Sequence, residues 1–528
     1  MKTYNIIKGI FAATVLSVVF SGCSEDAMDR INKDHGHTQS VAARFILTDV
    51  ITSTAFSNAG GDFNTYLSAY IEYEVGVDNQ LYYAETRESE PTSSSTFNNT
   101  WNGLYSTLKS ARIIINQCSE GGIDHGNYVT KGMAEVLAAY NCALIADEHR
   151  NQVGVGIEMV GDAPCSQAAL IDENGSPVYL TPKMDKQEEI YTQAMQYLDD
   201  AIADLQKEDL IDPEAQDLLY QGDAEKWLKL AYGLKARYTM HLLKRSANKD
   251  ADMEKVLEYV NNSFESAEEQ AAFDVYDANN INPLYGFFVA RAGLGASESM
   301  RSKLAEYNDP RLSRAFITKQ GTSGKEQAPG TADNAVYAPN GTPEQGTSKY
   351  GTSLFMYSIS APTLLLSYHE LKFLEAEALC RLERDAKSAL KDAVVAGLLN
   401  AENSFTISRK ELGKTLINAA SSITEAEAES YFDNTIEAKY TAEPLKTTMT
   451  QKYFALWGAS GEATESYNDV RRMKGLGENF IELKNPNSFP LRCPYGNSDT
   501  TTNAEVKAAY GNGQYVYSEN VWWAGGSR

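Results

Sequence analysis

The stretch KQEEIYTQAMQYLDDAIADL, residues Lys186–Leu205, is the clearest helical segment of the chain and decides how the rest is interpreted. Its apolar residues recur at the spacing of one helix face, as Ile190, Ala194, Tyr197, Leu198, Ala201 and Leu205. That spacing is typical of an amphipathic helix with one buried side. Asp185 suits an N-cap, and Glu188 three residues later completes a capping-box pattern. The stretch therefore predicts a helix that is capped at Asp185.

A second helix is predicted just downstream, at Ala224–Arg245, with Asp223 as its cap. Its buried face carries Trp227, Leu230, Ala231, Leu234 and Tyr238. Trp227-x2-Leu230-Ala231 resembles the opening of a tetratricopeptide helix pair, and the two helices start about 38 residues apart, close to that repeat's period. A generic antiparallel hairpin of helices explains the same pattern equally well.

Helical spacing recurs along most of the remaining chain. The other predicted helices cover residues 39–56, 64–75, 97–117, 127–147, 363–382, 386–400, 424–440, 445–457 and 461–473. The pattern breaks at 76–96, 148–184, 264–361 and 484–528, which are predicted to be loops. We therefore expect a mostly α fold, in which tetratricopeptide-like helix pairs form a scaffold with long irregular excursions and few short strands. Residues 39–528 are expected to be a single domain, with a loop-rich insertion at about 264–361.

Composition limits the partners of this chain. It has 528 residues, with 47 Lys and Arg against 71 Asp and Glu, a formal net charge of −24. Such an acidic balance argues against nucleic acid, which requires clustered basic residues. Six scattered histidines suggest no metal site, and the cysteine spacings match no zinc or disulfide framework. Buried thiols are expected at Cys142 and Cys380, with a Cys118–Cys142 bridge as an alternative.

The first residues have the pattern of an export signal. Lys2 and Lys8 precede a short apolar run from Ile10 to Phe20, too short to span a membrane. Small residues then lead into Cys23, followed by Ser24-Glu25-Asp26. This looks like a bacterial lipobox, in which residues 1–22 are removed and Cys23 is lipidated; an ordinary secretory signal is the alternative. Residues 23–38 would then be a polar tether on the outer membrane, facing the extracellular side.

Seven short motifs, in order along the chain, resemble those of the SusD/RagB family of surface lipoproteins. They are Gly161–Ala168 (GDAPCSQA), Thr181–Asp185 (TPKMD), Gly222–Trp227 (GDAEKW), Asn308–Leu312 (NDPRL), Tyr368–Ala378 (YHELKFLEAEA), Gln451–Tyr453 with Asp469–Arg472, and Pro490–Arg492 with Asn503. Each is weak alone, but their order behind a lipobox is specific. Two departures are Cys165, where the family usually has Tyr, and Pro494-Tyr495, where it often has Tyr-Pro.

The resemblance implies more than the residues alone do. It implies a helical fold around four tetratricopeptide-like pairs and a position as a lid on a TonB-dependent, SusC-like transporter. It also implies capture of an extracellular glycan and its delivery to that partner, with no cofactor. It does not place the ligand, because the glycan-stacking aromatics of the family have no fixed motif.

Candidate ligand residues come from the loops. Sugar rings require aromatic platforms, and their hydroxyls require amide and charged side chains. Residues 76–96 and 274–291 combine both kinds. We expect Tyr82, Tyr83 and Tyr285 to be platforms, and Asp78, Asn282 and Arg291 to bind hydroxyls. Packing of these aromatics onto the helices is the alternative for each.

Catalysis is not expected. The sequence has no nucleophile, zinc, phosphate-loop or dinucleotide motif, and its paired carboxylates suit solvated helix faces. Glu370 and Glu375 lie in an apolar helix and are expected to be buried with partners. Three alternatives to glycan capture remain open: a lipoprotein that captures peptides or glycopeptides, a tetratricopeptide scaffold for another protein, and a lipoprotein glycosidase.

Overall fold

A computed structural model describes residues 41–87, 96–150, 161–172, 175–320, 324–327, 336–511 and 513–527. The predicted signal peptide, Cys23 and the tether lie outside these residues. Met1–Ala42 and Ala43–Arg528 separate into two compact units, and all elements named below belong to the second. Within the described residues, no helix combines the length and apolar character that crossing a membrane requires.

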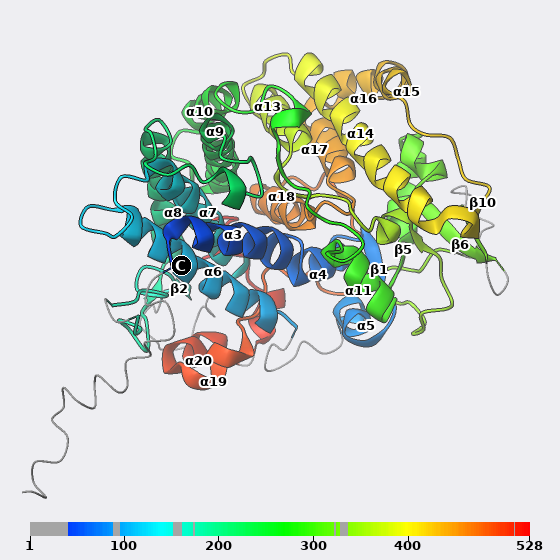
Figure 1. The fold of residues 1–528 in the computed structure, drawn as a ribbon. Helices are drawn as coiled ribbons and strands as arrows, with labels where there is room; N and C mark the ends of the chain where they lie inside the picture. The colour runs from blue at the N-terminus through cyan, green and yellow to red at the C-terminus, as the bar shows by residue number, and fades with distance from the viewer. Residues whose placement is uncertain are drawn as a thin grey trace, which may run out of the picture. The chain divides into compact units, whose positions relative to one another are not determined.

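The first half of the second unit is a series of helices, each packed on the next (Figure 1). They are α3 (Ala43–Thr52), extended by a π-helical segment at Ser53–Ala59, then α4 (Asp62–Tyr70), α6 (Asn98–Cys118), α7 (Tyr128–Glu148), α8 (Gln187–Asp204), α9 (Ala224–His241) and α10 (Lys249–Asn261). α7 lies between α6 and α8 and is buried along nearly its whole length. The predicted helices of this half are confirmed, except that the one at 64–75 ends at Tyr70.

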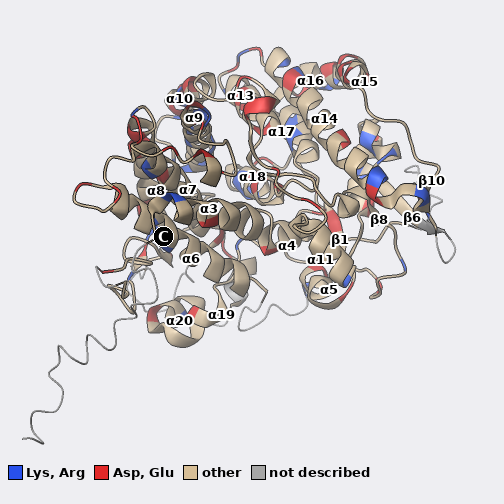
Figure 2. Ribbon diagram, in the orientation of Figure 1, with Lys and Arg blue, Asp and Glu red and all other residues tan. Residues whose placement is uncertain are grey.

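The second half is also mainly helical. Its helices are α13 (Tyr368–Arg381), α14 (Lys387–Leu412), α15 (Glu425–Tyr431), α16 (Glu437–Ala442), α17 (Pro444–Ala455) and α18 (Ala463–Leu476). α13 packs on α10, α14 and α17, which joins this group to the first. Figure 2 shows acidic and basic residues interspersed over α9, α10, α13 and α16. The fold is mostly α, with tetratricopeptide-like helix pairs, as the sequence predicts.

The cap of α8 differs from the prediction by one residue. The helix is capped at Lys186, whose backbone N–H donates to the Glu189 carboxylate at 3.0 Å. Asp185 is engaged elsewhere, because its carboxylate accepts hydrogen bonds from the backbone N–H groups of Cys165 and Ser166 at 2.9 and 2.6 Å. At α9 the predicted cap is confirmed, with Asp223 accepting from the N–H groups of Glu225 and Lys226. Asp185 therefore caps the turn at Cys165 and Ser166, and not the helix that the sequence pattern assigns to it.

The region predicted to be a loop-rich insertion contains short regular elements. These are β4 (Ala271–Phe273), α11 (Pro283–Arg291), β5 (Leu294–Ala296), α12 (Glu298–Glu306), β6 (Phe316–Gln320), β7 (Gly324–Gln327) and β8 (Thr352–Ser353). Most of these strands pair with segments distant in the sequence. β4 pairs with β9 (Thr363–Leu366), the first part of a predicted helix, and β5 pairs antiparallel with β1 (Glu74–Gly76). The insertion is therefore attached to both helical groups.

Buried arginines hold the helices together. Arg237 on α9 donates to both oxygens of Glu370 on α13, and Arg472 on α18 donates to both oxygens of Glu377. Arg471 donates to Glu148 of α7 at 2.9 Å. All these side chains are almost fully enclosed, so each charge depends on its partner. Glu370 is buried with a partner, as expected; Glu375 is less buried and pairs with Lys372.

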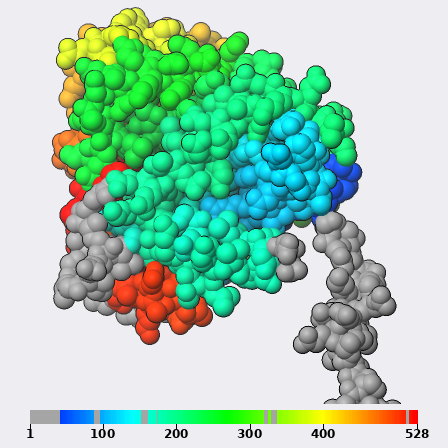
Figure 3. Space-filling model, turned by 90° about the vertical axis from the view of Figure 1, so that its left-hand side faces the viewer, coloured from blue at the N-terminus to red at the C-terminus, as the bar shows by residue number. Residues whose placement is uncertain are grey.

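The C-terminal tail, predicted to be a loop, contains two short helices. α19 (Asn497–Thr502) and α20 (Ala504–Tyr510) lie at the surface beside the segment around residue 184, as orange-red helices next to teal (Figure 3). Their core contains Trp101, Met184, Tyr495, Val506 and Tyr510.

Candidate functional site

The predicted loop 76–96 contains a helix, α5 (Asn79–Thr86), directly after β1. The sequence pattern does not predict α5, because only four of its eight residues are buried and two of these are polar. The four are Leu81, Ala84, Glu85 and Thr86. Tyr82 is half-buried and Tyr83 is 50% exposed. The two rings lie nearly perpendicular, with centroids 5.8 Å apart. α5 therefore presents a pair of adjacent aromatic side chains at the surface.

Buried polar groups fix the inner side of α5. The Glu85 carboxylate accepts hydrogen bonds from the N–H groups of Gly341 and Gly76, at 2.6 and 3.3 Å. Burial raises the pKa of Glu85 to about 7. At the end of the helix, Arg87 has a left-handed backbone and donates to the Asn487 carbonyl at 2.9 Å. Because Glu85 and Arg87 hold the C-terminal end of α5, Tyr82 and Tyr83 stand on a fixed support.

The second predicted segment contains α11, and Asn282 starts this helix. Its side-chain oxygen accepts from the N–H groups of Leu284 and Tyr285, while its amide donates to the carbonyls of Ala361 and Ala459. The side chain is only 1% exposed, so it does not reach ligand. The structure gives Asn282 a positioning role in place of the hydroxyl contact expected from the sequence.

Tyr285 and Arg291 lie at opposite ends of α11. The Tyr285 hydroxyl donates to the Glu411 carboxylate of α14 at 2.9 Å. Arg291 is exposed, and its guanidinium carbon lies 5.4 Å from the centroid of the Phe287 ring. Six residues of helix separate the two, about 9 Å along the axis. Tyr285 therefore faces α14, whereas Arg291 lies at the C-terminal end of α11, next to β5.

The pairing of β1 with β5 brings this end of α11 to α5, since α5 follows β1 and α11 precedes β5. Val77 donates its N–H to the Gly293 carbonyl at 2.9 Å, and the Tyr66 hydroxyl donates to Gln80 of α5 at 3.0 Å. The Tyr66 ring also lies 6.5 Å, centroid to centroid, from Phe287. Figure 1 draws α4, α5, β1 and α11 beside one another. We call this surface the α5–α11 face, and it comprises Asp62, Asp78, Gln80, Tyr82, Tyr83, Phe287 and Arg291.

Polar side chains surround the aromatics of the α5–α11 face. Asp78 accepts hydrogen bonds from the amides of Asn79 and Gln345, at 2.8 and 3.4 Å. Asp62, at the start of α4, accepts from Asn99 at 3.4 Å. Burial raises the pKa of Asp62, against the lowering effects of Asn99 and Arg291. The face thus joins exposed rings to hydrogen-bonding groups of both kinds, which suits recognition of polyhydroxylated rings.

Of the six predicted ligand residues, Asp78, Tyr82 and Tyr83 lie on or directly before α5, and Arg291 lies at the end of α11 that leads into β5. Asp62 was not among the predicted ligand residues. The only local signal was its place directly after the Gly60-Gly61 pair, where α4 begins. Gln80 and Phe287 lay within the predicted segments but were not selected, because their orientation depends on Tyr66. No local pattern identifies Tyr66 as the residue between α5 and α11.

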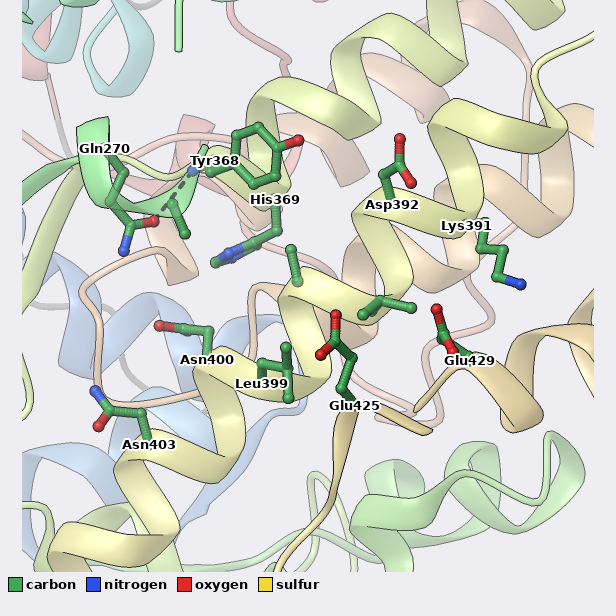
Figure 4. A pocket seen from close by; sticks show the side chains of 13 residues that line it. Gln270, Tyr368, His369, Lys391, Asp392, Leu399, Asn400, Asn403, Glu425 and Glu429 are labelled. Atoms are coloured by element: carbon green, nitrogen blue, oxygen red, sulfur yellow. Dashed lines mark hydrogen bonds between the residues drawn. The ribbon is translucent and has the colours of Figure 1, made fainter. Parts of the chain in front are cut away.

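A separate cavity of about 440 Å³ lies between α13, α14 and α15 (Figure 4). Gln270, Tyr368, His369, Asn400 and Asn403 line one side of it, and Asp392, Glu425 and Glu429 another. Lys391 is paired with Asp433 at 2.8 Å. This cavity has polar groups but a single large aromatic ring, so it suits ring stacking less well than the α5–α11 face.

Several carboxylates buried among the helices are bound by arginines, as at Glu370, Glu377 and Glu148. Within the described ranges, no group of three or more His, Cys, Asp or Glu residues is arranged to hold a metal ion. The geometry is that of a helical scaffold, with the α5–α11 face as the candidate recognition surface.

Comparison with known proteins agrees with this class. The model of the SusD-like family, described as starch-binding and associating with the outer membrane, matches residues 36–495. The chain belongs to this family, whose members are outer-membrane-associated nutrient-binding proteins. A comparison with curated proteins finds no match.

Solved structures support the assignment. A SusD/RagB family protein from Bacteroides thetaiotaomicron is 68% identical, with a TM-score of 0.87 over 93% of this chain and all of that one. A protein described as chitin-binding is 20% identical, with a TM-score of 0.67 over 91% of this chain and 99% of that one. A SusD homologue from Bacteroides fragilis is 18% identical, with a TM-score of 0.63 over 92% of this chain and all of that one. The last two show the fold alone.

Proposed function

We propose that this protein captures an extracellular oligo- or polysaccharide on the α5–α11 face and delivers it to a TonB-dependent transporter. The observation that carries the proposal is the pair of surface tyrosines on α5, with Glu85 bonded on the inner side of this helix. Asp78 directly precedes α5, and Arg291 lies at the end of α11 that the β1–β5 pairing joins to it. Tyrosine rings stack on the apolar faces of sugars, and polar groups such as these bind hydroxyls. Family membership supports the same class of ligand.

Binding to a panel of polysaccharides tests the proposal. In native gels containing neutral glycans, the mature protein should be retarded by at least one, and calorimetry with its oligosaccharides should give a saturable affinity. The double variant Tyr82→Ala/Tyr83→Ala should lose this retardation. The variant Tyr179→Ala is the matched control, because Tyr179 is 43% exposed on a different segment. Binding of peptides with no response to glycans would favour the alternative of peptide capture.

Anchoring through Cys23 is part of the proposal. The lipobox pattern and the acidic residues after it support an outer-membrane lipoprotein that faces the outside. Cys23→Ala should abolish incorporation of a fatty-acid analogue and release the protein from the membrane fraction. Equal labelling of both forms would contradict the anchor.

The transporter partner and the absence of catalysis complete the proposal. Purification in mild detergent should recover a large TonB-dependent barrel with this protein, and repeated recovery of the protein alone from cells that contain the barrel would argue against the partnership. Purified protein should release no reducing ends from any glycan that it binds. Turnover that one Asp or Glu substitution abolishes would favour the glycosidase alternative.

A further inference from the structure

Two cysteines that are not part of the α5–α11 face lie against each other inside the first helical group. The sulfur of Cys142, on α7, is 3.4 Å from the sulfur of Cys165. Both side chains are buried, at 0% and 1% exposure. A disulfide needs sulfurs about 2 Å apart, so the two sulfurs must move closer for the bond to form. Cys118, which the sequence allowed as a partner of Cys142, is not the neighbouring thiol.

The turn that carries Cys165 is clasped by elements on several sides. Arg112 of α6 donates to the Cys165 carbonyl at 3.0 Å, and the Tyr105 hydroxyl donates to the Pro164 carbonyl at 2.7 Å. The Asp185 carboxylate binds the N–H group of Cys165, and Ala163–Pro164 pairs with Met184–Asp185. These bonds hold the two sulfurs together irrespective of any covalent link, so their proximity is built into the fold.

The remaining described cysteines have different surroundings. The Cys493 thiol donates to the Glu148 carboxylate at 3.4 Å, and the Cys380 sulfur lies 3.6 Å from the Thr448 hydroxyl. Cys118 is buried in the apolar core, and burial raises the pKa of its thiol to about 12, which makes it unreactive. By contrast, the hydrogen bond from the Cys165 thiol, followed by the charge of Arg112, lowers the pKa of Cys142.

We propose that Cys142 and Cys165 form a structural disulfide when the protein is exported. The proposal rests on the proposed location outside the cytoplasm, because envelope compartments oxidise thiol pairs whereas the cytosol keeps them reduced. The bond would tie the GDAPC turn covalently to α7, the helix that lies between α6 and α8. It is therefore a stabilising modification of the scaffold, independent of the ligand face.

The oxidant would be a thiol–disulfide exchange protein of the cell envelope. The Cys165 thiolate attacks one sulfur of the carrier's disulfide, forms a mixed disulfide and displaces the carrier's other sulfur as a thiolate. The Cys142 thiolate then attacks the Cys165 sulfur, which forms the Cys142–Cys165 bond and releases the carrier's second thiolate. Two electrons pass to the carrier, and the two protons lost from the cysteines balance those on its dithiol. Because both sulfurs are buried in the packed state, the first step precedes docking of the turn on α7.

Thiol mapping of the full-length protein from cell envelopes tests the proposal. Cells are quenched in acid, and the protein is denatured and alkylated without reductant. Among the five body cysteines, we expect alkylation of Cys118, Cys380 and Cys493 only, and a peptide map that contains a linked pair with Cys142 and Cys165. After reduction, all five should be alkylated. The variant Cys165→Ala should leave Cys142 free, whereas Cys118→Ala, the matched control, should keep the linked pair.

Thermal unfolding gives a second readout. Reductant should lower the Tm of the wild type by a few degrees, since the bond restrains the unfolded chain. It should not lower the Tm of a folded Cys142→Ala/Cys165→Ala variant.

The outcomes separate this inference from the proposed location. Alkylation of both Cys142 and Cys165 in envelope protein that carries the lipid label would overturn the disulfide and leave the location intact. A linked pair containing Cys118 would also overturn it. Protein recovered in the cytosol without the lipid label would instead refute the proposed location. In that case the purified protein is oxidised in a glutathione disulfide buffer. Failure to form the Cys142–Cys165 bond there would overturn the proposed disulfide.

Discussion

Arg237 and Arg291 show how differently the helical groups and the α5–α11 face use the same side chain. Arg237 is enclosed between α9 and α13, with both of its hydrogen-bonding edges facing carboxylates of Glu370 and Glu465. Arg291 is exposed and lies over a phenylalanine ring at the end of α11. The first arginine completes a core, and the second leaves donors available to a ligand. Under the proposed function, stability and recognition belong to separate residues, and substitutions should separate them.

The largest effect is expected from breaking a buried pair in the helical groups. Arg237→Met leaves the Glu370 carboxylate enclosed without its bidentate partner, which costs about 3–5 kcal/mol in the free energy of unfolding. Calorimetric unfolding should show a much lower Tm, whereas glycan affinity measured well below that Tm should stay close to wild type. An unchanged Tm would mean that the Arg237–Glu370 pair contributes little to stability. A loss of glycan affinity without a loss of Tm would mean that the helical groups also take part in binding.

The next effect concerns pH and the strand that leads into α5. Burial raises the pKa of Glu74 on β1 from 4.5 to about 8, so the folded state retains a proton that the unfolded state releases. Stability should therefore be highest below about pH 4.5 for this group and fall as pH rises towards 8, by at most about 1.4 kcal/mol per pH unit.

The variant Glu74→Gln isolates this contribution. Its amide mimics the protonated carboxyl, so its Tm should fall less than that of the wild type between pH 5 and pH 8, a range that lies inside the roughly 4.5–8 window of Glu74. Glu85 and the other titrating groups are common to both proteins and cancel in the difference. Parallel Tm profiles for the two proteins would contradict the assignment.

A smaller effect is expected on the α5–α11 face. Loss of one ring or of the exposed guanidinium, in Tyr83→Ala or Arg291→Ala, should weaken glycan binding severalfold to about tenfold, for a stacking contribution of about 0.5–1.5 kcal/mol. The Tm should remain that of the wild type, because Tyr83 is half-exposed and Arg291 is exposed. Calorimetry with the best oligosaccharide measures both affinities. A ligand-bound structure with the sugar on the α13–α15 cavity would move the site away from this face.

The smallest effect marks the edge of the face. Tyr285→Phe removes only the hydroxyl that donates to Glu411, on the α14 side of α11. Affinity should change by less than twofold, which is under about 0.4 kcal/mol. A tenfold loss would show that the ligand extends along α11 as far as α14.

The sequence predicted the helices whose apolar residues form a long stripe, such as α6, α7, α8 and α9. It failed where a neighbour distant in the sequence decides the structure. α5 has few inward residues and depends on Glu85 and Tyr66, and β1, β4, β5 and β9 exist because they pair across the chain. The same limit applies to the site: residue types on two segments were predicted, but the burial of Asn282 and the bond from Tyr285 to Glu411 follow from tertiary packing.

The pairing of Glu74 with Ala296 also sets an order of assembly. While the chain is being made, α5 lacks its distant neighbours, and it meets α11 only after the intervening helices have been synthesised. Closing so long a loop is slow compared with helix formation. The α5–α11 face should therefore be among the last parts of the molecule to mature, and under the proposed function an incompletely folded chain would not yet bind ligand.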